Sequence, residues 1–521
     1  MTTSIMLKSI RETLVNFCLE FLSLTLILGW REYCRPILFE DAKFKKYCTF
    51  ETCAFHSLNF RLYSKEMQEK ITAGGDRLSD LPDPILIHIL SKLWDGKKQV
   101  VRTSVLSTRW RFLWMSVPVS LNFTFPDSEK QNVTLDYLSS THRKLYYYKS
   151  FEKIRRFSVW GLRYEERYAK DVDLWVHFAC TKVEEFTLGL LCINDQIYEF
   201  PQFAYKGKML KNLVLKNLKL NPCVNCSLVS LEIGYVKLTD GVMEKVLSGC
   251  HNLECLELEH VSGIHRLEIS SVKLRELTIR DYYDENLEIL APYIQHLEIL
   301  GKGSEIRIEQ RNVASLFYAI LRLDFDFEDE ERNLEKECSY LKELLHGVSH
   351  VENLELGSWC IECLSILELK GWQFPLSSRK FLELNIALEQ SDFLGICSFL
   401  QSSSDLETLA IDCWDNHNAR DTLSRYTNED EQTRRFETHN FNGSFPHLKT
   451  IKIDNFYGSL SENKSVLSLV KYLLKHATVL ENFVLAASFL GSDVSLDYVK
   501  MAQEILSFPR SSPHASVVFS Y

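Results

Sequence analysis

The feature that most constrains this chain is a recurring six-residue pattern, Leu-x-x-Leu-x-Leu, in which Ile, Val or Phe also fill the apolar positions. The last two apolar positions alternate with the residue between them, as in a strand buried on one face, and the intervening segments offer helices such as 240–247. One unit cannot bury its own leucines, so the units must stack continuously. The pattern therefore predicts an α/β solenoid of parallel strands with helices. Its occurrences are Leu228/Leu231/Ile233, Leu253/Leu256/Leu258, Ile264/Leu267/Ile269, Leu274/Leu277/Ile279, Ile294/Leu297/Ile299, Val351/Leu354/Leu356, Leu364/Leu367/Leu369, Phe381/Leu384/Ile386 and Leu406/Leu409/Ile411.

The spacing of these units is uneven. In places it lies well outside the roughly 20 to 29 residues usual for such repeats. We therefore expect an irregular solenoid with insertions near 301–345 and 412–440. The acidic stretches 328–331 and 415–435 lack apolar periodicity, and solvated loops are expected there.

In several units the residue between the last two apolar positions is acidic. Strand alternation predicts that these side chains project from the exposed face of the sheet, about 4.8 Å apart on adjacent strands, where like charges repel. Either neighbouring cations such as Arg266, Arg280 and Lys370 neutralise the row, or the row recognises a basic surface on a substrate. The acidic residues are Glu232, Glu257, Glu268, Glu298, Glu355 and Glu368.

The segment from Asp76 to Pro118 has a different pattern, which predicts three short helices. Asp83 can cap the first helix, and Pro84 suits its first turn because a missing N–H has no cost there. Apolar residues follow at helical spacing to Leu93, a second helix is expected around 100–106, and Ser107 can cap a third. Three short helices bury little by themselves, so the surplus of apolar side chains indicates a partner.

Three runs carry a family resemblance: 81–86 (LPDPIL), 101–107 (VRTSVLS) and 109–114 (RWRFLW). They closely resemble the F-box of plant F-box proteins, although the loop 94–99 is longer than the family's usual turn. The resemblance implies docking on a Skp-type adaptor, which links the F-box to a cullin and to ubiquitin transfer. The alternative is that the same residues are only the core of a small helical domain. The implied adaptor-binding residues are Leu81, Pro82, Ile85, Leu86, Ile89, Leu90, Ser107, Trp110, Leu113 and Trp114.

The C-terminal segment predicts a strand after Phe445, a helix over 466–474 and a strand over 479–485. It resembles the FBD domain that follows leucine-rich repeats in many plant F-box proteins, especially at 469–474 and 479–481. We expect it to cap the last edge of the solenoid. The expected domains are an N-terminal extension (1–75), an F-box (76–122), a leucine-rich-repeat solenoid (123–440) and an FBD domain (441–515).

Composition narrows the partners and the compartment. A net charge of −10 and the absence of a basic run argue against a nucleic-acid partner. The 15 cysteines are scattered among leucine-rich segments, which favours buried thiols in the cytoplasm or nucleus over a disulfide framework. Cys223-x-x-Cys226 and Cys360-x-x-Cys363 have the spacing of half zinc sites, but buried thiols are again favoured, and we expect no metal or cofactor.

Residues 1–75 contain an apolar run, Phe21 to Trp30. Its uncharged core is only about ten residues long, short for a membrane span, and Phe17, Phe21, Leu24 and Leu28 share one helical face. A membrane segment is therefore not favoured, although an anchor through residues 14–30 stays an alternative.

No phosphate-binding loop, zinc-protease motif or nucleophile elbow occurs. The chain is expected to bind rather than catalyse. The resemblance implies the substrate-recognition subunit of a Skp-cullin-F-box (SCF) ubiquitin ligase, in which the repeats bind an unknown protein target. The alternatives are a leucine-rich-repeat scaffold outside any ligase and a membrane-anchored receptor.

Overall fold

A computed structural model describes residues 81–91, 103–126, 131–149, 154–193, 196–221, 226–282, 286–302, 306–324, 334–386, 388, 392–413, 434, 444–456, 464–487 and 496–520. The chain divides into two compact units. The first unit comprises Met1–Ser120 and Leu145–Arg155, and the second comprises Leu121–Lys144 and Arg156–Tyr521. The expected extension 1–75, with its candidate anchor, lies outside the described residues.

The first unit contains the predicted short helices. They are α3 (Asp83–Ser91), a 3-10 turn η2 (Thr103–Val105) and α5 (Trp110–Ser116). Helix α3 begins where the sequence predicts, and the Pro82 carbonyl accepts hydrogen bonds from the N–H groups of Ile85 (3.0 Å) and Leu86 (3.1 Å). The predicted second helix is seen only as η2, since residues 92–102 are not among those described.

The second unit is organised around a 15-stranded sheet, and every recorded pairing from β3 to β20 is parallel. Its strand order follows the chain, as a stacked repeat requires. The strands are β1 (Val119–Thr124), β2 (Ile154–Tyr164), β3 (Val183–Cys192), β5 (Asn212–Lys216), β7 (Ser230–Lys237), β8 (Cys255–Ser262), β10 (Glu276–Arg280), β12 (His296–Lys302), β14 (Tyr318–Asp324), β15 (Asn353–Gly357), β16 (Phe381–Asn385), β17 (Thr408–Asp412), β18 (Thr450–Phe456), β19 (Asn482–Ala487) and β20 (Ser516–Ser520).

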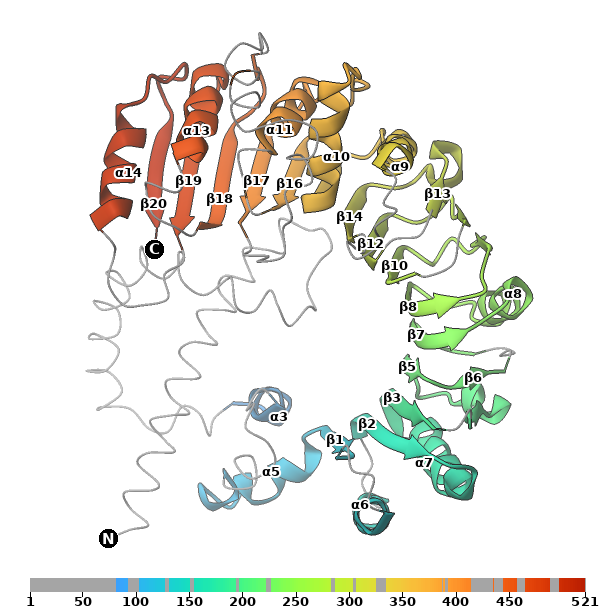
Figure 1. The fold of residues 1–521 in the computed structure, drawn as a ribbon. Coiled ribbons are helices and arrows are strands. Elements are labelled where there is room, and N and C mark those ends of the chain that lie inside the picture. Colours follow the sequence, from blue (N-terminus) through green and yellow to red (C-terminus); the bar gives the residue numbers. More distant parts are fainter. Residues whose placement is uncertain are drawn as a thin grey trace. The chain divides into compact units, whose positions relative to one another are not determined.

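Helices line one side of this sheet, which curves away from them (Figure 1). We call the helix-covered side the outer face and the opposite side the inner face. Two smaller parallel sheets also occur: β9 (Arg266–Glu268), β11 (Leu287–Leu290) and β13 (Ile306–Ile308) form one, and β4 (Glu199–Phe200) pairs with β6 (Lys219–Leu220) in the other. The helices are α6 (Gln131–Tyr148), α7 (Ala169–Lys182), α8 (Asp240–Gly249), α9 (Leu334–Gly347), α10 (Ser358–Leu369), α11 (Asp392–Gln401), α13 (Lys464–His476) and α14 (Leu496–Ser507); short 3-10 turns are η3 (Glu166–Tyr168), η4 (Gln202–Lys206) and η5 (Gln310–Val313).

The repeat pattern sets the register of the sheet. Leu231, Leu256, Leu277 and Leu297 lie opposite one another on consecutive strands, and each is at most 1% exposed. The residues between the buried positions are half-buried on the inner face, giving the alternation typical of strands. The predicted α/β fold of parallel strands with helices is therefore confirmed, and so is the helix at 240–247, within α8.

Two predicted units are wrong in detail. Leu364, Leu367 and Leu369 belong to helix α10, which is buried on nearly all sides, so its apolar residues do not show a helical period. In β16 the buried positions are Leu382 and Leu384, two residues earlier than predicted. Short apolar runs do not distinguish a strand from a buried helix.

The C-terminal segment continues the sheet. The predicted strands appear as β18 and β19, and the predicted helix appears as α13. Helix α14 and strand β20 follow, and β20 is the last strand in the sheet order. Of the two predicted insertions, the first contains α9, while the acidic stretches 328–331 and 415–433 lie outside the described residues.

No helix in the described part of the chain is long and apolar enough to cross a membrane.

Candidate functional sites in the F-box segment and on the inner face

The first unit has a small core of its own. Leu86, Leu90, Trp110, Leu113 and Val117 pack together, and the partly buried Leu81, Ile87 and Leu106 lie against them. Leu86, Leu90, Trp110 and Leu113 thus belong to the core of this unit, as the alternative of a small helical domain expects, and their contact with an adaptor stays a prediction. The three short elements have few apolar residues with which to form a core, and they use these. Ile89 is also buried, at 3% exposed.

Other apolar side chains of this unit remain exposed. Of the predicted adaptor-binding residues, Pro82 and Ile85 are exposed and Ser107 is half-buried, while the side chain of Trp114 lies outside the described part. Val105 on η2 and Phe112 on α5 are 66% and 64% exposed, and the sequence analysis did not single them out. Phe112 lies between the buried Trp110 and Leu113, so helical spacing could have placed it on the opposite side. We call Pro82, Ile85, Val105 and Phe112 the exposed apolar set.

Polar contacts connect the start of α3 to the segment before α5. The Arg109 guanidinium donates to the Asp83 carboxylate through Nε (2.9 Å) and Nη2 (2.6 Å), and to the Leu81 carbonyl (2.6 Å). Asp83 therefore has a role in addition to the predicted position at the helix start. The Trp110 N–H donates to Ser107 Oγ at 3.4 Å, as expected of a helix cap.

The inner face holds four of the six predicted acidic residues: Glu232, Glu257, Glu298 and Glu355. Glu232 and Glu257 lie directly opposite each other on β7 and β8. The other two are placed elsewhere. Glu268 is on β9 of the three-stranded sheet, and Glu368 is on helix α10, so neither belongs to the row.

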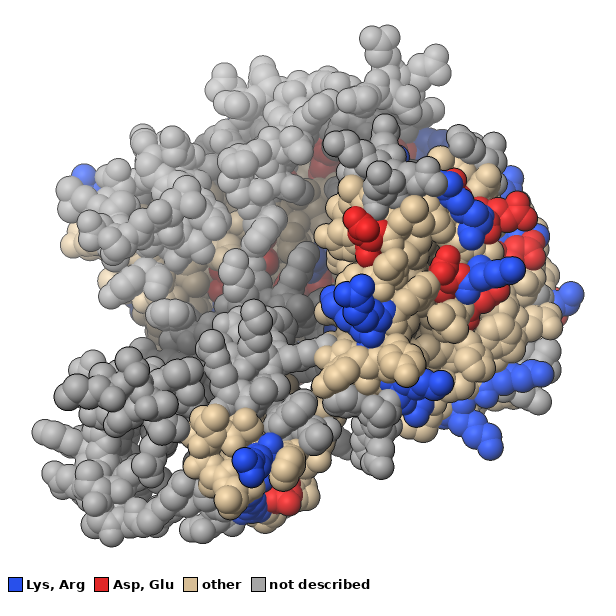
Figure 2. Space-filling model, turned by 90° about the horizontal axis from the view of Figure 1, so that it is seen from below, with Lys and Arg blue, Asp and Glu red and all other residues tan. Residues whose placement is uncertain are grey.

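Cations interleave with these carboxylates. The Lys216 ammonium lies between Glu232 (2.6 Å) and Glu259, Arg280 pairs with Glu257 (2.6 Å) and Glu298 (3.8 Å), and Arg322 pairs with Glu355. The predicted neutralisation by Arg280 is thus confirmed. Figure 2 shows basic and acidic side chains interspersed over the described part of the surface seen from below.

The other predicted cations act elsewhere, and two important ones were missed. Arg266 pairs with Glu268 in the small sheet (3.4 Å), and Lys370 pairs with Glu335 (3.4 Å). Lys216 and Arg322 were not singled out, because the strands that carry them depart from the repeat pattern used in the sequence analysis.

The protonation of these carboxylates reflects both burial and pairing. Burial raises the pKa of Glu257 and of Glu355, against the opposing effect of their arginine partners. Burial acts the same way on Glu259, but its hydrogen bond and charge interaction with Lys216 hold the pKa of Glu259 below its ordinary value. The cations therefore oppose the effect of burial on the pKa of each of these carboxylates.

A second set of carboxylates lies further along the inner face, where the sequence analysis did not look. Glu383 on β16 is directly opposite Glu355, and Asp412 on β17 is directly opposite Asp454 on β18. Asp412 accepts a hydrogen bond from the Asn455 amide (2.7 Å), and Lys452 pairs with Asp454 (2.6 Å). Glu383 has no hydrogen-bond or ion-pair partner among the described residues. Burial, followed by the charge of Glu355 and then by Asp412 and Asp454, raises the pKa of Glu383 to about 7.

Aromatic residues border the first part of the row. The Tyr235 ring stacks on His260 (4.3 Å between centroids), its hydroxyl donates to Glu259 (3.1 Å), and His260 lies 3.3 Å from the Asp281 carboxylate. Tyr235, His260 and Asp281 occupy equivalent positions on successive strands and have positive φ angles of 55°, 48° and 48°. This left-handed kink turns the chain at the same point in these three successive repeats.

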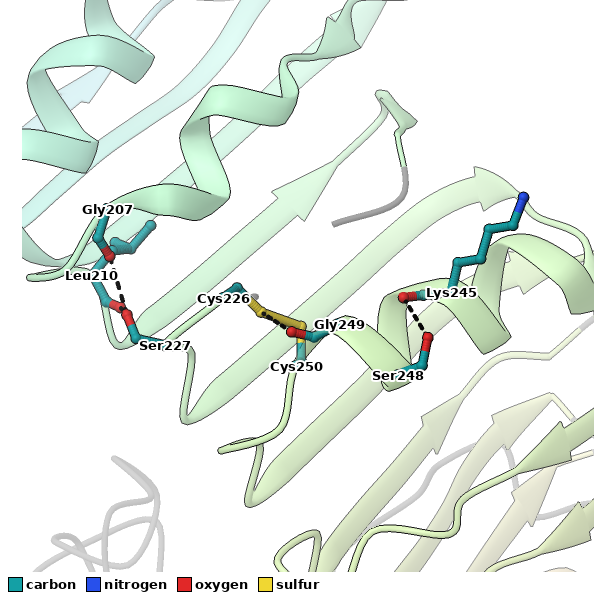
Figure 3. Close-up of a disulfide and its surroundings, with 8 residues drawn as sticks. All are labelled: Gly207, Leu210, Cys226, Ser227, Lys245, Ser248, Gly249 and Cys250. Atoms are coloured by element: carbon teal, nitrogen blue, oxygen red, sulfur yellow. Dashed lines mark hydrogen bonds between the residues drawn. A yellow bond between two sulfur atoms is a disulfide. The ribbon is translucent and has the colours of Figure 1, made fainter. Parts of the chain in front are cut away.

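The cysteines differ in part from expectation. Cys226 and Cys250 form a disulfide, with their Cα atoms 5.1 Å apart, where thiols were expected. Figure 3 shows the pair beside Gly249, whose carbonyl accepts the Cys226 N–H at 3.0 Å. The chain meets itself here because Cys250 ends α8 just before the strand that pairs with β7. Six of the other eight cysteines in the described residues are buried, as predicted, whereas Cys192 is exposed and Cys255 is half-buried.

The described residues contain one cluster with metal-ligand spacing. Ligand oxygens of Glu232, Glu257 and Glu259 lie within 4.8 Å of one another. The Lys216 ammonium already pairs with two of these carboxylates. Of the two cysteine pairs with the spacing of half zinc sites, Cys360 and Cys363 are buried on α10, as expected of buried thiols, while Cys226 is paired with Cys250 and Cys223 lies outside the described residues.

Comparison with known proteins agrees with this architecture. The family described as "At1g61320/AtMIF1, LRR domain" matches residues 152–505. The chain belongs to this leucine-rich-repeat family. It is 28% identical over 460 residues to F-box/LRR-repeat protein At3g03360 of Arabidopsis thaliana, covering 86% of this chain and 91% of that protein. It is 27% identical over 474 residues to F-box/FBD/LRR-repeat protein At5g44980 of the same plant, covering 85% of this chain and 99% of that protein.

A third relative, putative F-box protein At1g49610 of Arabidopsis thaliana, is 30% identical over 352 residues, or 65% of this chain and 85% of that protein. These matches confirm the predicted membership of the plant F-box/leucine-rich-repeat/FBD family. The protein is therefore of the F-box receptor kind, and it has a leucine-rich-repeat domain.

Proposed function

We propose that this leucine-rich-repeat protein is the substrate-recognition subunit of an SCF-type ubiquitin ligase. The F-box segment binds a Skp-type adaptor and, through it, a cullin, while the repeats bind a target protein. The observation that carries the proposal is the exposed apolar set, whose side chains lie outside the described core of the first unit. Exposed apolar side chains that do not join a core are typical of a binding surface.

The proposed contribution to ubiquitin transfer is proximity rather than chemistry. A target held by the repeats stays near the ubiquitin-conjugating enzyme on the same assembly, which raises the effective concentration of its lysine side chains. This role requires access to the adaptor, so we place the protein in the cytoplasm or nucleus.

The test separates the surface of the F-box segment from its core. Ile85→Asp and Phe112→Asp place charge at exposed positions of α3 and α5, so the variants should remain folded and lose co-purification with a plant Skp-type adaptor. Leu174→Asp on α7, at a position that is 53% exposed, is the matched control and should retain the adaptor. Full adaptor binding by folded Ile85→Asp and Phe112→Asp chains would contradict the proposal and favour a scaffold outside any ligase.

A further inference from the structure

The inner face of the main sheet is open within the described part of the second unit, because the helices there line the outer face (Figure 1). Parallel sheets are usually covered on both faces. The inner-face side chains of β5, β10, β16 and β17 are half-buried, whereas Glu355 on β15 is buried, at 3% exposed. A surface of this kind is available to a partner.

Two rows of inner-face positions run across the strands from β5 to β18, one in register with Val214 and one in register with Lys216. Together these two rows have an excess of negative charge. Eight carboxylates stand there against four lysine and arginine side chains. The carboxylates are Glu232, Glu257, Glu259, Glu298, Glu355, Glu383, Asp412 and Asp454, and the cations are Lys216, Arg280, Arg322 and Lys452.

The first part of this face shows how it holds a cation. Lys216 lies between carboxylates of β7 and β8, and its ammonium is also 5.6 Å from the centre of the Trp160 ring. Arg280 lies between carboxylates of β8 and β12. In both cases one long basic side chain bridges two acidic groups from different strands.

The arrangement changes after β14. The inner-face position that holds Lys216, Arg280 and Arg322 on earlier strands is occupied by Asn385 on β16 and by Asp412 on β17. Within the described part of the chain no cation bridges Glu383 to a second carboxylate, and the residue directly opposite it on β17 is Ala410, which has a short side chain. On β16 and β17 these two inner-face positions hold carboxylates and no lysine or arginine, and the next cation, Lys452 on β18, pairs with Asp454 (2.6 Å).

From this comparison we infer that the inner face of β16 to β18, centred on Glu383 and Asp412, binds lysine or arginine side chains of an extended basic segment in the target protein. The inference rests on the proposed function, and it specifies the chemistry of the target. The partner's cation takes the position that Lys216 and Arg280 occupy on earlier strands. Tyr318 and Phe381, half-buried on neighbouring strands of the same face, offer apolar surface to the methylene stem of such a side chain.

The dimensions suit a short peptide. Adjacent strands lie about 4.8 Å apart, so the five strands from β14 to β18 span roughly 20 Å. An extended peptide covers this distance in about six residues, and residues at every second position point to the same side. The probe is therefore the acetylated octapeptide (Gly-Lys)4, with (Gly-Gln)4 as the uncharged control.

Binding is measured by isothermal titration calorimetry with the purified full chain at about 150 mM salt, where long-range attraction is screened. The double variant Glu383→Gln/Asp412→Asn should lose at least tenfold in affinity for (Gly-Lys)4. The matched control is Glu268→Gln/Glu288→Gln, which removes the same charge from the three-stranded sheet and should change affinity less than twofold. Equal losses in both variants, or no binding by the native chain, would overturn the inference.

The pH dependence gives a second readout. Affinity of the native chain for (Gly-Lys)4 should rise between pH 6 and pH 8 as Glu383 ionises, and Glu383→Gln should flatten this rise. A rise unchanged in Glu383→Gln would contradict the assignment. The charged and titratable groups around Glu383 are Tyr318 and Arg322 on β14, Glu355 on β15, Asp412 on β17, and Lys452 and Asp454 on β18.

The adaptor experiment is run on the same variants. A chain that co-purifies with the adaptor but ignores (Gly-Lys)4 removes this inference and leaves the proposed function standing. A chain that binds the peptide but does not co-purify with the adaptor removes the proposed ligase function and leaves the peptide-binding surface standing.

Discussion

Glu383 is expected to make the stability of the repeat unit depend on pH. Its pKa is raised from 4.5 to about 7 in the folded chain, first by burial and then by Glu355. Between these two pH values the folded chain binds more protons than the unfolded chain, so stability falls as the pH rises through this window. Below the unfolded pKa Glu383 is protonated in both states and does not change the free energy of unfolding. Above the folded pKa the ionisation of Glu383 lowers the free energy of unfolding by its full amount.

The size of this effect follows from the shift. Each pKa unit corresponds to about 1.4 kcal/mol, so ionising Glu383 in the folded chain costs up to about 3 kcal/mol. Glutamine has the shape of the protonated side chain and cannot ionise. Glu383→Gln should therefore match the native chain near pH 4.5 and exceed its stability by about 2 to 3 kcal/mol at pH 8.

The assay is urea unfolding followed by tryptophan fluorescence at several values between pH 4.5 and pH 8, comparing the variant with the native chain at each pH. Glu268→Gln is the control, because its carboxylate is 59% exposed on the three-stranded sheet and should give a nearly constant difference. A Glu383→Gln advantage that does not grow with pH would refute the reasoning, as would equal growth in the control.

Three further changes test the fold. Trp110→Ala removes the largest side chain from the described core of the first unit and should destabilise that unit by about 3 to 5 kcal/mol. Backbone amides of α3 and α5 should then exchange hydrogen faster, while those of the repeat strands exchange as in the native chain. Native exchange rates in α3 and α5 would contradict the packing. Gly263→Ala should lower the free energy of unfolding in urea by more than about 1 kcal/mol, because φ is +84° and a Cβ would overlap a neighbouring backbone oxygen. At Gly241 on α8 an added Cβ meets nothing within 4 Å, so Gly241→Ala should stabilise by up to about 1 kcal/mol. Equal effects of the two changes would be inconsistent with these environments. Cys250→Ser should lower stability by about 3 kcal/mol under oxidising conditions, given the separation of 24 residues from Cys226, and a difference that persists in reductant would not fit a disulfide.

The sequence predicted the parts of the fold that depend on local period. Leu256 and Leu258 alternate around Glu257, and this is enough to place a strand with one buried face. Helix α13 was predicted for a similar reason, since its apolar residues recur at helical spacing. A period is a property of neighbours in the chain, so it can be read without knowing the fold.

The candidate sites were predicted only in part. The six acidic residues share one position of the repeat pattern, yet Glu268 is on a different sheet and Glu368 is on a helix. A local pattern does not say which sheet a segment joins, or whether a short apolar run is a strand or a buried helix. The F-box segment was recognised from its residues, but counting apolar side chains could not tell which of them face inward. Trp110 is buried and Phe112 is exposed although only two positions separate them.

The sequence by itself determined the repeat architecture, the order of the strands and the family, because these follow from side-chain period and from runs of matching residues. Only the tertiary structure decided how charges pair across strands. Lys216 is 16 residues before Glu232 and 43 before Glu259, and the three meet because parallel stacking brings equivalent positions of successive repeats together. The position of Glu383 among carboxylates also follows only from the tertiary structure, since Glu355 and Asp412, whose charges raise its pKa, lie on neighbouring strands and not beside it in the sequence.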